Sequence, residues 1–230
     1  MNRENNQNSF LDKRNTADLV ADTILLLYLI NKIWPKGKKP IDKTSFEAKV
    51  RIMKTVFLSE YFMVKERMKG FNFFFNIYHY GPSSLNVLDL LDDLLDSELI
   101  EENRKENEFG YRIKEKASKN LNFYIKDFTP QKIDKFLKII DGVVKKYGHL
   151  EYKNLIEKIY SLNVIPYKSK RGTLNIKSEV AKHNQEPKYK PKLLEKMDKK
   201  DYDKELPLDR GWKETFLVLT SPNLNRIITE

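Results

Sequence analysis

The chain of 230 residues carries 43 basic and 33 acidic side chains, a net charge of +10, and 40% of its residues are hydrophobic. This length and composition allow one packed domain with a smaller satellite and exclude a loop-rich or repetitive chain. Because there is no cysteine, disulfides, thiolate zinc sites and cysteine nucleophiles are excluded. The start is polar, and the most apolar run, residues 23–30, is far shorter than the ~20 residues that span a bilayer. We therefore expect a cytoplasmic protein without a membrane partner.

Residues 1–14 are expected to form a flexible tail, and residues 16–33 the first helix. Thr16 is a suitable N-cap, and Pro35 ends the helix. Apolar residues cover most of the helix circumference, which is typical of a helix buried on several sides, either within one chain or at an oligomer interface. A homodimer through helix 16–33 is therefore one expectation.

The second helix follows a basic linker, residues 35–40. Thr44 and Glu47 fit a capping box, in which the threonine hydroxyl accepts from the N3 amide and the glutamate reaches back. Apolar residues then recur every three or four positions from Phe46 to Met68, as on one face of a helix. The basic residues off this stripe predict a basic outer face: Lys49, Arg51, Lys54, Lys65 and Arg67.

An aromatic strand is predicted for residues 71–78, where side chains alternate with a period of two. Gly81 and Pro82 should form the turn after it, with the glycine supplying backbone freedom and the proline at the first turn of the next helix. We interpret His79 as a side chain that pins the strand to a helix rather than as a contact residue. The turn is then a structural feature, made of Tyr78, His79, Tyr80, Gly81 and Pro82.

The third helix, residues 84–98, is predicted to begin at Ser83 or Ser84 and to have one apolar and one acidic face. The acidic face has spacings of i, i+3, i+4 and i+7 and consists of Asp89, Asp92, Asp93 and Asp96. One helix face rarely offers the converging oxygens that Mg²⁺ or Ca²⁺ require, so we expect a solvated surface and no metal site. A carboxylate repels a phosphate by about 1 kcal/mol at 4 Å even in water. This helix is therefore not expected to enter the major groove of DNA.

Residues 100–113 are predicted to form a β-hairpin with its tip at residues 103–107, because Phe109, Tyr111 and Ile113 alternate on the return strand. Helix, helix, short strand, helix and hairpin is the element order of a winged helix-turn-helix variant. The sequence therefore predicts a mainly α fold with a small β-hairpin wing, of α+β class. Residues 15–125 form its winged-helix-like domain.

Beyond this domain, residues 126–163 are expected to form a pair of helices that packs on it, because a capped apolar stripe and a second short amphipathic segment follow one another. Residues 164–210 are lysine-rich and punctuated by proline, so we predict a basic irregular arm. Residues 211–230 contain an apolar run and are expected to dock on the body or on a partner.

Three segments resemble a group of small, mostly uncharacterised prokaryotic proteins: Lys49-Val-Arg-Ile-Met-Lys-Thr-Val-Phe57-Leu58, Tyr78-His-Tyr-Gly-Pro82-Ser-Ser84, and Leu88-Asp89-x-Leu91 running to Glu98-Leu99-Ile100. Their shared pattern is an amphipathic helix, an aromatic strand, a Tyr-Gly-Pro-x-Ser turn and a helix that exits into a hairpin wing. The match covers roughly residues 45–115 and is also distantly similar to the Panacea antitoxin domain. The resemblance implies a winged-helix-like module and, for the Panacea relatives, toxin neutralisation through protein contacts. Glu98 stands where the family often has glycine.

No catalytic pattern is found in the sequence. The three histidines are far apart, and there is no Gly-rich phosphate-binding loop and no serine-hydrolase elbow. Glu47-Ala-Lys49 and Glu186-Pro-Lys188 match half of a nuclease signature, but such tripeptides are common in a chain rich in lysine and glutamate. We therefore expect no enzymatic activity and no cofactor.

The distribution of charge leaves two functional hypotheses, besides a lysine-rich surface that serves solubility alone. Residues 83–108 have a net charge of −7, between residues 32–69 at +7 and residues 112–158 at +6. The first hypothesis is a regulatory or defence-associated protein that binds nucleic acid, chiefly its backbone, through basic faces other than the third helix. Its candidate residues are Lys49, Arg51, Lys54, Arg104, Lys105, Lys168, Lys170 and Arg171.

The second hypothesis is an antitoxin-like or adaptor protein. Its acidic helix, residues 84–98, would bind a basic protein partner, and charge complementarity would set orientation and association rate. The candidate partner-binding residues are Asp89, Asp92, Asp93 and Asp96.

Overall fold

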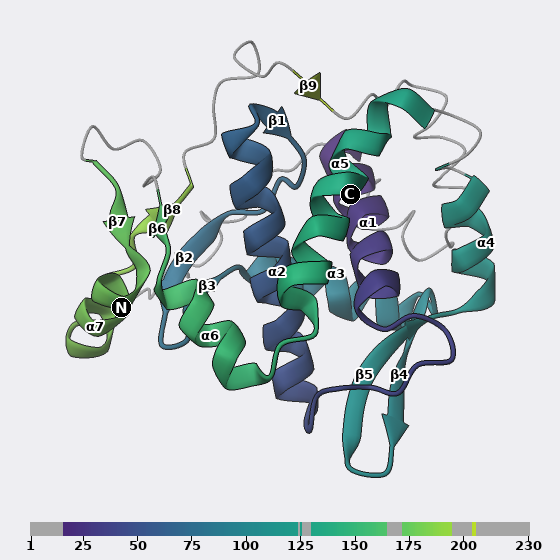
Figure 1. Ribbon diagram of the computed structural model, residues 1–230, viewed down its shortest axis with the longest axis horizontal. Helices are drawn as coiled ribbons and strands as arrows, with labels where there is room; N and C mark the ends of the chain where they lie inside the picture. The colour runs from purple at the N-terminus through teal and green to yellow at the C-terminus, as the bar shows by residue number, and fades with distance from the viewer. Residues whose placement is uncertain (1–15, 124, 126–129, 165–171, 195–203, 206–230) are drawn as a thin grey trace, which may run out of the picture.

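The computed structural model describes residues 16–123, 125, 130–164, 172–194 and 204–205, and its architecture is mixed α+β (Figure 1). The predicted α+β class is therefore confirmed. The predicted flexible tail, residues 1–14, and the predicted docking segment, residues 211–230, lie outside the described residues. The helical elements are α1 (Thr16–Ile33), α2 (Ser45–Lys65), α3 (Leu85–Asp96), α4 (Glu115–Phe123), α5 (Pro130–Val143), the π-helical turn η2 (Val144–Gly148), α6 (Tyr152–Tyr160) and α7 (Ile176–Gln185). The strands are β1 (Met68–Lys69), β2 (Phe75–Tyr78), β3 (Gly81–Ser83), β4 (Ile100–Lys105), β5 (Glu108–Ile113), β6 (Asn163–Val164), β7 (Leu174–Asn175), β8 (Lys192–Leu193) and β9 (Lys204–Glu205).

α2 is the central helix of the fold, and α1, α5 and α6 pack around it (Figure 1). Its N-terminus is capped as the sequence predicts, because the Thr44 hydroxyl accepts from the backbone N–H of Glu47 at 3.2 Å. The Glu47 carboxylate in turn accepts from the backbone N–H of Lys43 at 2.8 Å. One orphan amide of the first turn, that of Glu47, and the amide of Lys43 just before the cap are thus satisfied.

The middle of α2 is buried on every side, since each residue from Arg51 to Tyr61 is buried. Its polar side chains can be buried because they form hydrogen bonds to backbone carbonyls of the same helix. The hydroxyl of Thr55 donates to the carbonyl of Arg51, and that of Ser59 donates to the carbonyl of Thr55, both at 2.8 Å. The sequence of α2 shows one apolar stripe, so it does not indicate that the polar side of the helix is also buried.

α1 is buried inside the same chain. Residues 24–30 are each at most 8% exposed, and α2, α4, α5, η2 and β5 pack against the helix. Of the two alternatives, burial within one chain is confirmed. The predicted homodimer through helix 16–33 is wrong, because the apolar side chains it needs are already covered.

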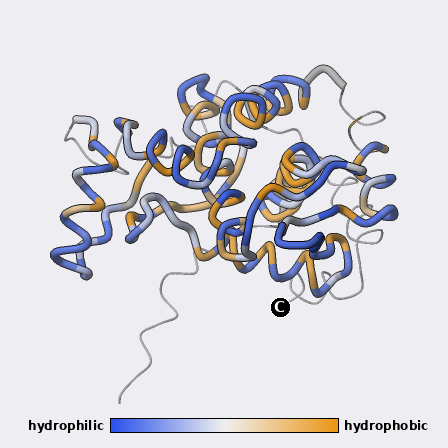
Figure 2. Tube along the Cα trace, turned by 60° about the horizontal axis from the view of Figure 1, so that its bottom comes forward, coloured by the Kyte–Doolittle hydropathy of each residue, from blue (hydrophilic) through white to orange (hydrophobic). Residues whose placement is uncertain are grey.

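Most helices have two faces. Hydrophobic and hydrophilic residues alternate along the helical turns in Figure 2, which is typical of helices that bury one side. In the part of the chain that the structure describes, no helix combines the length and the apolar character needed to cross a membrane.

The turn after β2 differs from the prediction. β2 and β3 are antiparallel, with Ile77 opposite Pro82, so Gly81 and Pro82 lie in a strand and the turn consists of His79 and Tyr80. Pro82 is therefore not at the first turn of α3, which begins at Leu85. The predicted need for glycine does hold, since Gly81 has φ +88°.

The hairpin β4–β5 has the predicted position, with Ile100 opposite Ile113 and Lys105 opposite Glu108. The chain enters it through Glu98, which has φ +56°. This left-handed conformation closes the C-terminus of α3 and is the one for which glycine is preferred.

Both helices predicted after residue 126 are present, as α5 and α6. α5 continues into η2, and the main contacts of α5 and of α6 are with α2. α4, which was not predicted, precedes them and buries Ala117 and Leu121. Its residues are mostly polar, and only three of them, Ala117, Leu121 and Phe123, are apolar, so no clear stripe indicated a helix in the sequence.

The predicted irregular arm, residues 164–210, is wrong for the part of it that is described. Residues 176–185 form α7, which packs against β2, β3 and α6. Asn175 caps it by accepting from the backbone N–H of Ser178 at 3.2 Å. The buried positions Ile176, Val180 and His183 have helical spacing. Three such positions in a segment rich in lysine were too few to indicate a helix from the sequence. β8 adds a third strand beside β2, and β9 pairs in parallel with β1.

Candidate nucleic-acid interface

Arg51 was predicted to face a nucleic acid and instead forms a buried ion pair with Asp42. Their side chains are 2% and 0% exposed, and Arg51 Nη2 lies 2.7 Å from Asp42 Oδ1. Arg51 Nη1 also donates to the carbonyls of Gly148 and Leu150, at 3.0 and 2.7 Å. The prediction is wrong for Arg51, because its guanidinium is fully used inside the protein and no phosphate can reach it.

Lys54 is buried as well. It is 2% exposed, and its Nζ donates to the carbonyl of Pro82 at 2.6 Å. Burial lowers the pKa of Lys54 to about 7, since desolvation penalises the charged form. The prediction of a nucleic-acid contact is wrong here too. The sequence places Lys54 off the apolar stripe of α2, but β3 covers the helix at this residue.

Lys49 joins the basic face of α2 to the acidic face of α3. Its Nζ lies 2.9 Å from Asp92 Oδ1, with side chains 35% and 57% exposed. An exposed pair of this kind contributes about 0–1 kcal/mol. Lys49 is therefore accessible, but its positive charge is balanced by the acidic helix beside it.

The rest of the acidic face lies where the sequence predicts. Asp89 and Asp96 are exposed, and Asp93 is half-buried. Together with Asp92 they give α3 an outward face of carboxylates, and the buried side of the helix is apolar. This placement agrees with a helix that does not approach phosphates.

The hairpin tip carries two of the predicted contact residues. Arg104 and Lys105 are both exposed. The guanidinium of Arg104 pairs with Glu102 at 2.7 Å and lies 5.2 Å from the ring centroid of Phe109, so its charge is partly used within the hairpin. The remaining candidates, Lys168, Lys170 and Arg171, lie outside the described residues.

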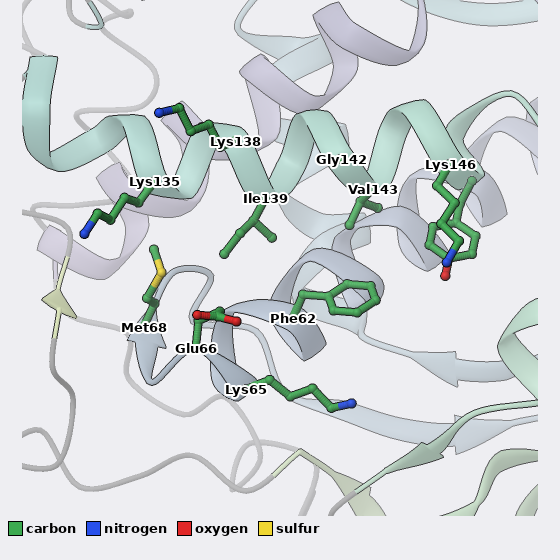
Figure 3. A pocket seen from close by; sticks show the side chains of 11 residues that line it. Phe62, Lys65, Glu66, Met68, Lys135, Lys138, Ile139, Gly142, Val143 and Lys146 are labelled. Atoms are coloured by element: carbon green, nitrogen blue, oxygen red, sulfur yellow. The ribbon is translucent and has the colours of Figure 1, made fainter.

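Tertiary structure instead assembles a different basic site, in a groove between the C-terminal part of α2 and the α5–η2 helix (Figure 3). The groove has a volume of about 530 Å³. Its apolar wall consists of Phe62, Met68, Ile139 and Val143, and its lysines are Lys65, Lys135, Lys138 and Lys146. We call this feature the α2–α5 groove.

The lysines of the α2–α5 groove are exposed, and Glu66 is the single acidic residue among those that line it. Within the described part of the chain, Lys65, Lys138 and Lys146 form no ion pair. Lys65 Nζ lies 4.5 Å from the ring centroid of Tyr61, a cation–π contact that orients the side chain and leaves its charge unneutralised. The groove is therefore locally electropositive, unlike the surface around Lys49.

One signal in the sequence could have indicated half of this site. Lys135, Lys138 and Lys146 recur at i, i+3 and i+11, which places them near one another around α5 and η2, off the apolar stripe. Lys65 is 70 positions earlier than Lys135, and only the packing of α2 against α5 brings the two lysines to one groove.

The residues of the predicted structural turn contact α6 and α7. His79 Nδ1 lies 2.7 Å from Asn184 Oδ1, and the rings of His79 and His183 are 4.9 Å apart between centroids. The hydroxyl of Tyr160 donates to the backbone carbonyl of His79 at 3.3 Å. His79 therefore pins the β2–β3 turn to a helix, as interpreted, although that helix is α7.

Nothing in the described residues gathers three or more His, Asp or Glu side chains into a possible metal site. Comparison with protein-family models, with curated proteins and with solved structures gave no match. Function is therefore inferred from the α2–α5 groove and from the distribution of charge around it.

Proposed function

We propose that this protein is a non-enzymatic, winged-helix-like regulatory or defence-associated protein that binds nucleic acid through the α2–α5 groove. The observation that carries the proposal is the convergence of four exposed lysines on one groove with an apolar wall. The order of α1, α2, β2, β3, α3 and the β4–β5 hairpin agrees with a winged-helix-like arrangement. The third helix of that arrangement is the acidic α3, so the contact surface is a different one.

The charge of the groove suits a phosphate backbone. Each lysine that neutralises a phosphate releases condensed counterions, and this supplies affinity that does not depend on base sequence. Lys135 and Lys138 approach from α5, Lys65 from α2 and Lys146 from η2, so the charges border a channel rather than a single point. A strand lying along the groove would meet lysines from both of its sides.

The apolar wall favours an unpaired strand over a duplex. Phe62 and Ile139 are half-buried and line the groove between its lysines (Figure 3). A duplex presents phosphates and sugars to such a surface, whereas a single strand also presents base faces that stack on aromatic and apolar side chains. We therefore expect single-stranded DNA or RNA to bind more tightly than a duplex of equal length.

Fluorescence anisotropy over a salt series tests this function. With four lysine contacts and a slope of about −0.7 per contact for single strands, log K should fall against log salt with a slope of about −3. The variant with Lys65, Lys135, Lys138 and Lys146 changed to alanine should bind at least tenfold more weakly and lose most of the slope. If no single-stranded or double-stranded probe binds at low salt, the proposal is wrong.

A matched control keeps the same change in net charge. Lys153, Lys158, Lys177 and Lys188 are exposed and do not line the groove, so their fourfold alanine variant should bind nearly as the unaltered protein does. Equal loss in both fourfold variants would show that net charge alone drives binding. A separate Arg104→Ala/Lys105→Ala variant measures the contribution of the hairpin tip.

A second candidate function is the antitoxin-like or adaptor role, in which α3 binds a basic protein. The exposed carboxylates of Asp89, Asp92 and Asp96 favour it. Their asparagine variants keep the size of each side chain and remove its charge. A partner that co-purifies with the unaltered protein and not with this variant would support the role, and retention of every partner would count against it.

A further inference from the structure

A second, smaller pocket lies between α2, the β2–β3 hairpin and α3, away from the α2–α5 groove. It has a volume of about 180 Å³, which is below the ~300–1,000 Å³ of pockets that enclose drug-sized ligands. Its occupant is therefore a small molecule or a single side chain. The residues that matter for its chemistry are Phe46, Lys49, Lys54, Tyr78, Tyr80 and Leu88, and all of them line it. We call it the Lys54 pocket.

The entrance of the Lys54 pocket is aromatic and exposed. Phe46 and Tyr80 are 52% and 51% exposed, and their rings meet edge to face with centroids 5.6 Å apart. Two large aromatic side chains that stay half in water and touch each other bury little surface in the folded chain. An apolar group that binds between or beside the two rings would remove more of their surface from water, and this burial is favourable.

Lys54 gives the same pocket a buried cationic donor. An ammonium group has three N–H donors, and Pro82 O is the single acceptor that Lys54 Nζ has within the described residues. Pro82 stands between two residues of the pocket wall, Gly81 and Ser83, so the amine lies beside the pocket. A buried ammonium with unused donors is costly unless an acceptor, preferably a charged one, is supplied.

We propose that the Lys54 pocket binds a small carboxylate with an aromatic or branched apolar body. The carboxylate accepts from the Lys54 amine, and the apolar body contacts Phe46 and Tyr80. Free aromatic acids and the C-terminal residue of a polypeptide share this chemistry. The inference does not depend on nucleic-acid binding, because no residue lines both sites.

Titration by ligand-observed NMR tests the proposal without any variant. Phenylacetate serves as the free acid, N-acetylphenylalanine as the mimic of a C-terminal residue, and phenylacetamide as the neutral isostere of phenylacetate. Saturable binding of a carboxylate, at least tenfold tighter than that of the amide, is expected, and the tighter of the two acids identifies the source. No saturable binding, or equal affinity for acid and amide, would overturn the proposal.

Variants assign the binding to the residues named. Lys54→Met keeps the length of the side chain and should remove the preference for acid over amide. Tyr80→Ala changes an exposed side chain and should weaken acid and amide alike, so the proposal stays testable even if Lys54→Met fails to fold. Lys65→Met, in the α2–α5 groove, should change neither affinity. Unaltered acid preference in a folded Lys54→Met protein would place the carboxylate elsewhere and refute the site.

The pH dependence of binding offers an independent readout. Besides Lys54, the titratable groups on the pocket wall are Lys49, Tyr78 and Tyr80, and Lys49 is already paired with Asp92. Since burial lowers the pKa of Lys54 to about 7, the free amine must take up a proton to bind an anion above that pH. Affinity for phenylacetate should fall by up to tenfold per pH unit above pH 7, and affinity for phenylacetamide should not change. A flat profile for phenylacetate would contradict the assignment to Lys54.

Discussion

Arg51 and Asp42 form a buried ion pair that holds four segments of the chain together. Asp42 lies in the α1–α2 linker and pairs with Phe109 of β5 through the backbone, and Arg51 lies on α2 and donates to the carbonyls of Gly148 and Leu150. The guanidinium thus satisfies a carboxylate and two carbonyls at once, which offsets the cost of removing the charges from water.

Replacing Arg51 by alanine should therefore destabilise the protein strongly. The change leaves the Asp42 carboxylate buried without its partner, for which the expected loss is about 3–5 kcal/mol in the free energy of unfolding. Urea denaturation measures it. Lys49→Ala is the control, since it breaks an exposed ion pair with Asp92 and should cost at most about 1 kcal/mol. Similar losses in the two variants would show that the Arg51 pair is not structurally important.

Glu98→Gly should stabilise the protein. Glu98 has φ +56° at the end of α3, where a side chain costs about 1–2 kcal/mol relative to glycine. Its ion pair with Lys114 spans 3.2 Å and involves a glutamate side chain that is 78% exposed, so little is lost with it. The expected gain in the free energy of unfolding is about 1 kcal/mol, measured by urea denaturation.

Glu98→Ala is the matched control, because it removes the same ion pair and keeps a Cβ at the left-handed position. It should not share the stabilisation that glycine gives. A loss of stability in Glu98→Gly would mean that the ion pair, or the freedom that glycine gains in the unfolded chain, outweighs the relief of strain.

The stability of the protein should depend on pH through Lys54. The pKa of Lys54 falls from an ordinary value of 10.5 to about 7 on folding. Between pH 7 and pH 10.5 the unfolded chain therefore binds one more proton than the native protein, and stability rises with pH by up to about 1.4 kcal/mol per unit. Below pH 7 both states hold the proton, and this contribution is constant and least favourable.

Lys54→Met isolates this contribution. The difference in unfolding free energy between the variant and the unaltered protein should favour the variant most at pH 6–7 and decrease as pH rises toward 9. Urea denaturation at several pH values gives this difference directly. A difference that stays constant over that range would show that Lys54 keeps its ordinary pKa in the folded protein.

Gly110→Ala should destabilise the core beside the hairpin. A Cβ at Gly110 would lie 2.7 Å from Trp34 Nε1, and Trp34 is 3% exposed and meets the ring of Tyr111 at 5.7 Å between centroids. Both rings are buried, so the clash must be relieved inside the core, and we expect a loss of about 1–3 kcal/mol. Gly142→Ala is the control, because a Cβ there meets nothing within 4 Å, and it should be neutral or stabilising in a helix. Thermal unfolding of both variants makes the comparison.

Local patterns in the sequence determined several of the longer regular elements of this fold. The stripe of α2, the cap at Thr44, the alternation that becomes β5 and the apolar stripe of α5 are each set by residues within one or two turns of one another. Such spacing depends only on the repeat of a helix or strand, and it could be predicted before any contact was known. The acidic face of α3 was predicted for the same reason.

Tertiary structure alone decided which charged residues face water. A lysine or arginine off the apolar stripe of α2 has the same local pattern whether that side meets solvent or another element. Asp42 and the carbonyls of Gly148 and Leu150 enclose Arg51, and β3 covers Lys54 through the carbonyl of Pro82. The same packing of distant segments, α2 against α5, brought Lys65 beside Lys135. Burial and proximity are properties of contacts between residues far apart in the chain, and no local pattern of side chains encodes them.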